Sequence, residues 1–485
     1  MKYANIQYIL LSLLPRGWGI PRGSIMLFCS YVFVLLFLPV TVLGYFLLNR
    51  FRASAGKLWL LAASLFFYGY FSIPYLFLLL GSLAVNSLLG CILFRHKKKW
   101  LFAAGVVLNL FLLGYCKYYD FFISNINTLF ATDFVLKHLL LPLGISFFTF
   151  QQISYLSDVY HDELKEKYSL LTYSLFVTFF PQLVAGPIVL ANEMMPQFAD
   201  PSNQKINSQN MSCGIFIFSL GLAKKILIAD KMAPFADQLF AMNEPGFPDS
   251  LMGSLAYCFQ IYFDFSGYCD MAIGIGLMFN IILPVNFSSP YRSGNIQEFW
   301  RRWHITLGRF LSQFVYFPLG GSRKGEGRAY LNLAFTFFVS GVWHGANWMM
   351  ILWGCLHGGA MMLHRFWKKV LNKTMPHWLG VSLTFLFVWL VWIFFRAENM
   401  TQAVRVFSGF INFSPEKFRS FSESFSGKDL LMYLVSAGII CFLPPANSFR
   451  ERFKPAVWNL AAAIILLICS VFSFNRISPF IYFNF

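Results

Sequence analysis

Charged residues are scarce in this sequence. Asp, Glu, Lys and Arg together make up 12% of its 485 residues, whereas a soluble globular chain carries about 25%. About half of the usual solubilising surface is therefore missing, which excludes a soluble enzyme with a polar coat. Intrinsic disorder is excluded as well, because a disordered chain combines low hydrophobicity with high net charge.

The chain also lacks the short motifs of several large enzyme classes. It contains no phosphate-binding loop, no dinucleotide-binding glycine fingerprint, no HExxH zinc motif and no visible internal repeat. Its nine cysteines form no CxxC pair and are scattered, mostly through apolar runs. They predict small buried hydrophobic residues, and neither a disulfide framework, a metal site nor a bound cofactor is expected.

Apolar and aromatic residues are abundant instead. They make up 57% and 19% of the chain, and 59 residues are Phe. Since one crossing needs about 20 apolar residues, the chain can cross a bilayer on the order of ten times. The sequence therefore predicts an all-α, polytopic membrane protein with roughly 11–13 transmembrane or re-entrant helices and no separate soluble domain.

One apolar run differs from the others in its length and polar content. The run at 251–283 is longer than one crossing needs and contains Asp264, Asp270 and several glycines. Irregular backbone at membrane depth survives only beside protein or a water-filled cavity, so we expect a cavity there. The apolar runs lie at 26–48, 58–72, 75–94, 100–116, 137–157, 170–190, 211–229, 251–283, 331–347, 348–366, 378–395, 429–446 and 456–472.

The basic residues indicate how the chain is oriented in the membrane. The net charge is +17, and Lys and Arg recur in short segments after every second apolar run. Cytoplasmic loops carry this excess of positive charge, so we expect these segments in the cytoplasm and no nucleic-acid partner. The segments contain Arg50, Arg52, Lys57, Arg95, Lys97, Lys98, Lys99, Lys165, Lys167, Lys224, Lys225, Lys231, Arg323, Lys324, Arg328, Lys368, Lys369, Arg450, Arg452 and Lys454.

The two ends of the chain are expected to differ from the membrane domain at 26–472. The short apolar stretch at the start is broken by Pro and Gly and has no cleavage site, so 1–25 does not resemble a signal peptide. We expect 1–25 to be an N-terminal extension, either part of the protein or upstream of its true start. The charge pattern predicts an extracytoplasmic aromatic tail at 473–485.

Two histidines are candidates for chemistry. His344 is surrounded by apolar residues, and an ionisable residue at membrane depth marks a functional site unless a nearby carbonyl simply satisfies it. His304 ends the segment 298–304, where helical spacing predicts that it shares a face with Arg301. That segment either anchors the protein among lipid headgroups or binds an anionic ligand such as phosphate.

The remaining ionisable residues in apolar runs leave alternatives open. His357 and His364 are seven residues apart on one helical face, and they predict packing or lining residues. Asp264 and Asp270, together with His344, would suit an ion or proton relay in a transporter. A transporter normally shows paired broken helices in repeated halves, which are not visible in this sequence.

A series of separated motifs resembles a known family. In order, they are PLGISFFTFQQISYLSDVY at 142–160, FFPQLVAGPI at 179–188, DFSGYCDMAIGIGLMF at 264–279, NFSSPY at 286–291, EFWRRWHITL at 298–307, YFPLGGSRKG at 316–325 and SGVWHGANW at 340–348. They resemble the membrane-bound O-acyltransferase (MBOAT) family, in its bacterial branch that acetylates alginate and other envelope polysaccharides. The resemblance runs from about Met26 to the C-terminus.

The resemblance implies a funnel-like helical bundle in the bacterial inner membrane that uses acetyl-CoA from the cytoplasmic side as acyl-donor substrate. His344 then corresponds to the family's intramembrane catalytic histidine and His304 to the second histidine of the active site. A neutral imidazole is the best base near neutral pH, and His304 is expected to orient the thioester or stabilise charge. Further residues expected to bind the donor or line the cavity are Arg301, Arg302, Trp303, Asp264, Asp270, Trp343 and Asn347.

The tail adds a second resemblance. The segment 479–485 is similar to a C-terminal aromatic motif in which a tyrosine hydroxyl carries the acyl group, here Tyr482. An interfacial aromatic anchor is the alternative. The implied partners are membrane lipids, an extracytoplasmic esterase-like transfer protein and a polysaccharide acceptor. The alternative activity is D-alanyl or other acyl transfer to teichoic acid, lipid or protein.

Overall fold

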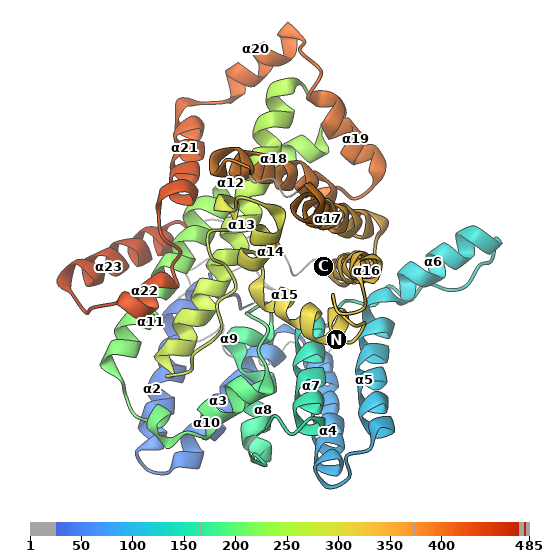
Figure 1. The fold of residues 1–485 in the computed structure, drawn as a ribbon. Helices are drawn as coiled ribbons and strands as arrows, with labels where there is room; N and C mark the ends of the chain where they lie inside the picture. Colours follow the sequence, from blue (N-terminus) through green and yellow to red (C-terminus); the bar gives the residue numbers. More distant parts are fainter. Residues whose placement is uncertain (1–25, 165, 372–374, 475–479, 482–485) are drawn as a thin grey trace.

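The computed structural model describes residues 26–164, 166–371, 375–474 and 480–481, and these residues fold almost entirely as helices (Figure 1). The α-helices are α2 (Leu38–Asn49), α3 (Ala53–Phe71), α4 (Ile73–Arg95), α5 (Lys99–Leu113), α6 (Tyr119–Phe130), α7 (Ile145–Tyr160), α8 (Leu170–Thr178), α9 (Phe180–Leu183), α10 (Ala191–Ala199), α11 (Ser208–Ala223), α12 (Asp230–Ala241), α13 (Phe247–Met278), α14 (Ile296–Arg302), α15 (Ile305–Leu311), α16 (Glu326–His344), α17 (Trp348–Phe366), α18 (His377–Arg396), α19 (Met400–Gly409), α20 (Pro415–Ser424), α21 (Gly427–Phe442), α22 (Ser448–Arg452) and α23 (Val457–Phe472). The prediction of an all-α protein is confirmed.

Within the described ranges, four helical segments are long and apolar enough to cross a membrane. A fifth crossing is possible if α20 and α21, which meet at an angle of 87°, count as one span. The other apolar runs form helices that are shorter, broken or more polar, and they pack around these spans. The four segments are Ile73–Arg95, Lys99–Phe130, Ser208–Ala241 and His377–Arg396.

Small cavities lie beside the run at 251–283, where Tyr268 and Met271 line them, but the irregular backbone predicted for this run is not found before Met278. Instead, α13 is a single uninterrupted helix of 32 residues. Its glycines allow α11 to approach closely, because a Cβ atom at Gly267 would lie 2.7 Å from the carbonyl oxygen of Gly221. A Cβ atom at Gly274 would likewise lie 2.6 Å from the carbonyl oxygen of Gly214. These glycines therefore serve helix packing, as small residues commonly do in membranes.

The prediction that Lys224 and Lys225 lie in a cytoplasmic loop is wrong. Both lie in η4 (Lys224–Ala229), a turn of π-helix inside the Ser208–Ala241 segment. Lys224 pairs with Asp270 at 2.6 Å and Lys225 pairs with Asp264 at 2.6 Å. Buried charges persist only when they are paired, and the partners stand on the neighbouring helix α13, where local sequence patterns cannot show them.

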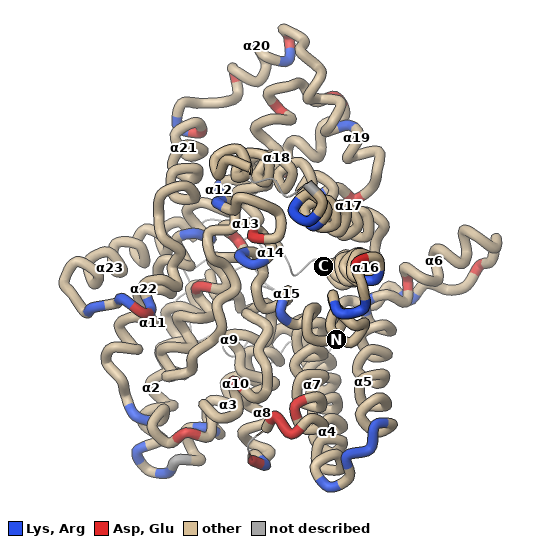
Figure 2. Tube along the Cα trace, in the orientation of Figure 1, with Lys and Arg blue, Asp and Glu red and all other residues tan. Residues whose placement is uncertain are grey.

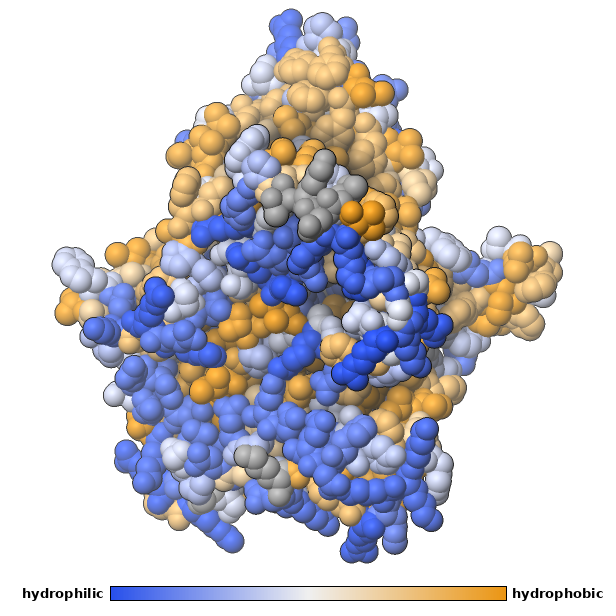
Figure 3. Space-filling model, in the orientation of Figure 1, coloured by the Kyte–Doolittle hydropathy of each residue, from blue (hydrophilic) through white to orange (hydrophobic). Residues whose placement is uncertain are grey.

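Polar and apolar residues are separated on the surface of the molecule. Lys and Arg cluster on the loops and helix ends that face the viewer in Figure 2. In Figure 3, hydrophilic residues cover much of the centre and the lower part of this face, with hydrophobic patches between them, and hydrophobic residues cover most of the upper part and the sides. Exposed Leu, Phe and Trp side chains are numerous, as expected where lipid replaces water. Three of the cysteines predicted to be buried, Cys355, Cys441 and Cys469, are also exposed.

Short helices fill the middle of the molecule between the long ones. The chain leaves α13, forms α14 and α15 near the centre of Figure 1, and returns to the periphery with α16. Large aromatic side chains pack there, and Trp303, Trp353 and Trp392 are almost completely buried. This aromatic core holds the segments that contain the two candidate histidines.

Candidate active site

His344 is the last residue of α16 and is almost completely buried. Its ring contacts the rings of Trp343 and Trp353, each with a centroid distance of 4.9 Å. Helix α16 can place His344 beside Trp353 of α17 because the two helices pack very closely. A Cβ atom at Gly341 would lie only 2.5 Å from the carbonyl oxygen of Met350 on α17.

His304 faces His344 across the aromatic core, and their ring centroids are 6.3 Å apart. The prediction that His304 continues a helix beside Arg301 is wrong, because α14 ends at Arg302 and α15 begins at Ile305. His304 has a φ of +46°, in the left-handed region that non-glycine residues rarely adopt. Such strained positions concentrate at functional sites. The break turns His304 inward, whereas Arg301 is exposed.

Asn286 fixes the tautomer of the neutral His304 ring. The Asn286 Oδ1 atom accepts hydrogen bonds from the Thr306 backbone N–H at 3.2 Å and from the Thr306 hydroxyl at 2.9 Å. Because the backbone N–H can only donate, this atom of the amide must be the oxygen. His304 Nδ1 lies 3.1 Å from the same oxygen, so Nδ1 carries the proton. The Nε2 atom of the neutral ring is then a proton acceptor.

A large cavity of about 700 Å³ opens between the segments that carry the two histidines, although neither histidine lines it. One wall comes from α14, α15 and η6 (Ser312–Tyr316), and the other comes from α16, α17 and η7 (Trp367–Leu371). Ser340 in this wall lies one helical turn before His344, and Ile305 directly follows His304. Its volume is in the range of small-molecule sites.

The lining of the large cavity contains both cationic and apolar side chains. Arg309 pairs with Glu193, while Arg365 and Lys369 pair with Glu326. The hydrogen bonds from Arg365 and Lys369 hold the pKa of Glu326 below its ordinary value. The other two cations, Arg301 and Lys368, form no ion pair within the described part of the chain. The apolar lining comes from Trp300, Leu307, Leu311, Leu333, Phe337 and Met361.

A small second cavity of about 30 Å³ is lined by His344, Trp343 and Lys117. The Lys117 ammonium donates a hydrogen bond of 2.5 Å to the backbone carbonyl oxygen of Trp343. The hydroxyl of Tyr118 donates to the preceding carbonyl, that of Val342, at 2.8 Å. Both groups satisfy carbonyls that the end of α16 leaves without helical partners. Lys117 is thereby held next to His344.

Several residues predicted to line the cavity make other contacts. Trp303 packs against Trp392 with ring centroids 4.9 Å apart. Asn347 begins α17 by accepting a hydrogen bond from the backbone N–H of Met350 at 2.8 Å. Arg302 pairs with Glu298 at 2.6 Å, which is the pairing that the four-residue spacing predicts. Only Arg301 of the predicted arginine pair lines the large cavity.

The two predicted aspartates pair with lysines, as described for α13. Asp264 and Asp270 are both buried, and their charges are matched by Lys225 and Lys224. Paired charges of this kind do not present a chain of exchangeable protons. His357 is buried against the rings of Trp300 and Trp353, whereas His364 lines the large cavity. No cluster of His, Cys, Asp or Glu with metal-binding geometry occurs among the residues that were placed.

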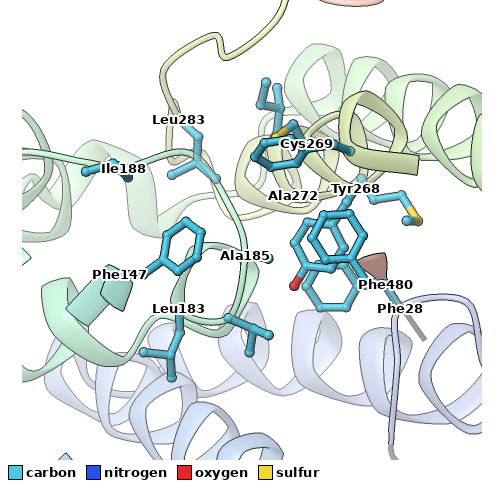
Figure 4. Packing of buried hydrophobic residues seen from close by; sticks show 14 of the residues in the cluster. Phe28, Phe147, Leu183, Ala185, Ile188, Tyr268, Cys269, Ala272, Leu283 and Phe480 are labelled. Carbon is cyan, nitrogen blue, oxygen red and sulfur yellow. The ribbon is translucent and has the colours of Figure 1, made fainter. Parts of the chain in front are cut away.

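Part of the C-terminal tail lies inside the molecule. Phe480 is 3% exposed and stacks on Tyr268, with ring centroids 4.7 Å apart. Figure 4 shows Phe480, Tyr268 and Phe28 gathered at one point of the core. The backbone N–H of Ile481 donates a hydrogen bond of 2.9 Å to Asp264. Tyr482, the predicted acyl carrier, lies outside the described residues.

Sequence patterns missed Asn286, Thr306 and Lys117. Asn286 begins the motif NFSSPY, so the motif could have suggested a function but not a contact with His304. Thr306 follows two residues after His304 and carried no separate signal. Lys117 stands at the end of an apolar run, where a basic residue normally indicates a membrane boundary.

Known proteins resemble this chain along nearly its whole length. Residues 132–402 match the model of the membrane-bound O-acyltransferase family, MBOAT. A peptidoglycan O-acetyltransferase of Helicobacter pylori is 42% identical over 96% of this chain and 99% of its own length. A probable alginate O-acetylase AlgI of Pseudomonas putida is 34% identical over 95% of this chain and all of its own. A teichoic acid D-alanyltransferase of Bacillus subtilis is 28% identical over 47% of this chain and 60% of its own.

Proposed function

Since the chain belongs to the membrane-bound O-acyltransferase family, we propose that it carries acetyl groups from acetyl-CoA across the inner membrane to hydroxyls of a cell-envelope glycan. It is an O-acyltransferase and a multi-pass membrane protein. The observation that supports this specific route best is the position of the buried histidine pair. Ile305 and Ser340, which lie near the two histidines in sequence, line the basic cavity, and the His304 ring contacts Phe265, which in turn contacts Phe480 of the C-terminal segment.

The large cavity suits acetyl-CoA. Phosphates are bound well by arginine and lysine side chains, and Arg301 and Lys368 are available for them. The apolar lining suits the pantetheine arm, and it includes Ile305, which directly follows His304. The basic rim is consistent with an opening toward the cytoplasm.

In the first chemical step, the hydroxyl oxygen of Tyr482 attacks the thioester carbonyl carbon. The carbon–sulfur bond breaks, a carbon–oxygen bond forms, and the products are acetyl-tyrosine and free CoA. A histidine removes the hydroxyl proton and returns it to the CoA sulfur. In the second step, a hydroxyl delivered by an extracytoplasmic esterase-like partner takes the acetyl group, and Tyr482 recovers its proton.

The hydrogen bond to Asn286 changes the role expected of His304. In the neutral tautomer, Nε2 cannot donate a hydrogen bond to a developing oxyanion. It can accept a proton, so we assign His304 to proton transfer together with His344. Lys117 lines the small cavity together with His344, and in its protonated form it would supply the positive charge that a developing oxyanion needs.

Peptidoglycan is the first acceptor to test, because the relative from Helicobacter pylori carries that activity in its name. Alginate-like polysaccharide is the second. D-alanyl transfer remains the alternative activity, and it requires a different donor.

The proposal is tested with membranes that contain wild type, His344→Ala or Tyr482→Phe. They are incubated with radiolabelled acetyl-CoA, a purified glycan and the co-expressed partner, and label is measured in protein and glycan. Glycan labelling by wild type that both variants lose supports the relay. Loss of glycan labelling in His344→Ala alone would show that Tyr482 is not the acetyl carrier. No transfer from acetyl-CoA by wild type contradicts the proposed donor.

A further inference from the structure

Asp264 makes two contacts in the middle of the membrane domain. Its side chain is 1% exposed, and Oδ1 lies 2.6 Å from the Lys225 ammonium. Oδ2 accepts a hydrogen bond of 2.9 Å from the backbone N–H of Ile481, which is 217 residues away in sequence. Lys225 also pairs with Asp230 at 2.8 Å. The C-terminal segment is thus bound to a buried ion-pair network.

The hydrogen bond from the Ile481 N–H to Asp264 stabilises the docked C-terminal segment. A buried carboxylate oxygen without a donor is costly, and bonds to an ionised acceptor are about twice as strong as neutral ones. The donor is a main-chain group, so the contact does not depend on which side chains the tail carries. The Lys225 ammonium lies against the other carboxylate oxygen and fixes the position of the side chain.

The residues around Asp264 hold the same segment and reach the active site. Phe480 stacks on Tyr268 and also contacts Phe265, with a ring centroid distance of 5.6 Å. Phe265 contacts the ring of His304 at 4.8 Å. One face of α13 therefore binds the tail and supports a histidine at neighbouring positions. The tail residue that follows Ile481 in sequence is Tyr482.

The end of α23 and the first residues after it make separate contacts with Tyr31. The Tyr31 hydroxyl donates a hydrogen bond of 3.1 Å to the carbonyl oxygen of Val471. The Tyr31 ring packs against Phe474 with centroids 4.9 Å apart. The segment is thus attached both where it leaves α23 and at residues 480–481, on either side of the intervening residues.

We propose that Asp264, held by Lys225, is a positioning residue that docks the C-terminal segment through the Ile481 N–H, and that acetyl transfer to Tyr482 depends on this docking. This inference rests on the proposed function of Tyr482 as acetyl carrier. The main-chain anchor stays the same whether the tyrosine is free or acetylated. Asp264 and Lys225 therefore act on the tail and not on the transported group.

Substitutions in the tail test the anchor without disturbing the buried ion pair. Ile481→Pro removes the donor N–H, and Ile481→Val is the matched control that keeps it. Two readouts are measured on protein in nanodiscs. Hydrogen–deuterium exchange of the C-terminal peptide reports docking, and acetylation of the protein by acetyl-CoA reports function.

We expect Ile481→Pro to lose exchange protection in the C-terminal peptide and to be acetylated about 100-fold more slowly, because a small misplacement costs this much. The KM for acetyl-CoA should stay unchanged, since the donor cavity is untouched. Ile481→Val should match wild type in both readouts. A general loss of structure would also raise KM.

A second pair of variants tests the anchor from the side of α13. Asp264→Leu removes the acceptor, and Lys225 keeps its ion pair with Asp230, so no buried charge is left unpaired. This variant should behave like Ile481→Pro. Asp264→Asn keeps an acceptor oxygen and should retain protection. Equal protection in wild type, Ile481→Pro and Asp264→Leu overturns the inference. Intact protection with no acetyl group on the wild-type protein overturns the proposed carrier function instead.

Discussion

The contact between Asn286 and His304 decides the chemistry at the scale of single residues. The Asn286 oxygen accepts three hydrogen bonds, two from Thr306 and one from the imidazole. Thr306 is itself fixed, because its hydroxyl accepts a hydrogen bond from the Ile188 backbone N–H at 3.0 Å. The tautomer of His304 is therefore set by a buried chain of hydrogen bonds that does not depend on solvent.

Asn286→Leu should lower the turnover of acetyl transfer. The substitution keeps the branched shape and the number of heavy atoms of the side chain but removes the acceptor that holds His304 Nδ1–H. General acid–base catalysis contributes about 100- to 10,000-fold, so we expect turnover to fall by at least about 10-fold. Turnover is measured from the release of free CoA.

Thr306→Val is the control for this prediction. It removes one of the hydrogen bonds to Asn286 and leaves the bond between Asn286 and His304 in place. Its effect should be clearly smaller. Wild-type turnover in Asn286→Leu would show that the tautomer of His304 has no part in catalysis.

At the scale of elements, the basic cavity is formed where two helical layers separate. Arg301 comes from α14 and Lys368 from η7, so the cations belong to different layers. The pKa of Glu326 is lowered by its two cationic partners, so Glu326 stays charged near neutral pH and neutralises part of the rim. The five lining cations outnumber their two carboxylate partners, Glu193 and Glu326, by three charges, which remain for a phosphate.

Arg301→Gln and Lys368→Gln should weaken donor binding. Each should raise the KM for acetyl-CoA severalfold with a small change in turnover. The reason is that each cation binds the donor phosphates equally in the ground state and in the transition state. Glu326→Gln should lower KM, since it frees two cations. Arg328→Gln, an exposed substitution outside the cavity lining, is the control and should change neither value. A fall in turnover at unchanged KM for the arginine and lysine variants would contradict this role.

The contact between α16 and α17 places His344, and glycines make it possible. A Cβ atom at Gly354 would lie 2.5 Å from the carbonyl oxygen of Phe337, so Gly354→Ala must push the helices apart. We expect a loss of about 1–3 kcal/mol in the free energy of unfolding. Gly359→Ala on the same helix meets nothing within 4 Å and should be neutral or stabilising. Thermal unfolding in detergent compares the two, and equal melting temperatures would contradict the packing argument.

Sequence patterns predicted the helical class and the family, because apolar composition and ordered motifs are properties of the chain itself. They could not predict which helices approach one another. The lysines of η4 resembled a loop boundary in the sequence, but in the structure they pair with aspartates of α13. His304 was predicted to continue a helix, but the helix ends at Arg302 and His304 lies in the interior. Contacts between distant segments, such as Asp264 with Ile481, leave no local pattern.

At the scale of the whole molecule, the arrangement suggests a protein that joins two compartments. Basic residues gather on one face, and the large cavity carries five of them. The histidine pair lies in the interior, and the tail enters the core from α23. Under the proposed function, the donor from one side and the tail from the other would meet at the two imidazoles.

The orientation can be tested with single cysteines in a chain whose own cysteines are replaced. Lys98 lies in the basic segment between α4 and α5, and Glu416 lies in α20; both are exposed. The positive-inside rule predicts that Glu416→Cys reacts with an impermeant maleimide in intact spheroplasts, while Lys98→Cys reacts only after lysis. The opposite pattern would reverse the proposed direction of transfer.

The most direct test of the account is to capture the acetyl group on the protein. Purified protein is incubated with acetyl-CoA but without glycan or partner, and its mass and peptide fragments are measured. We predict the gain of one acetyl group on the C-terminal peptide at Tyr482, absent in Tyr482→Phe and in His344→Ala. An unmodified C-terminal peptide, in a preparation that acetylates glycan once partner and glycan are added, would contradict the relay through the tail.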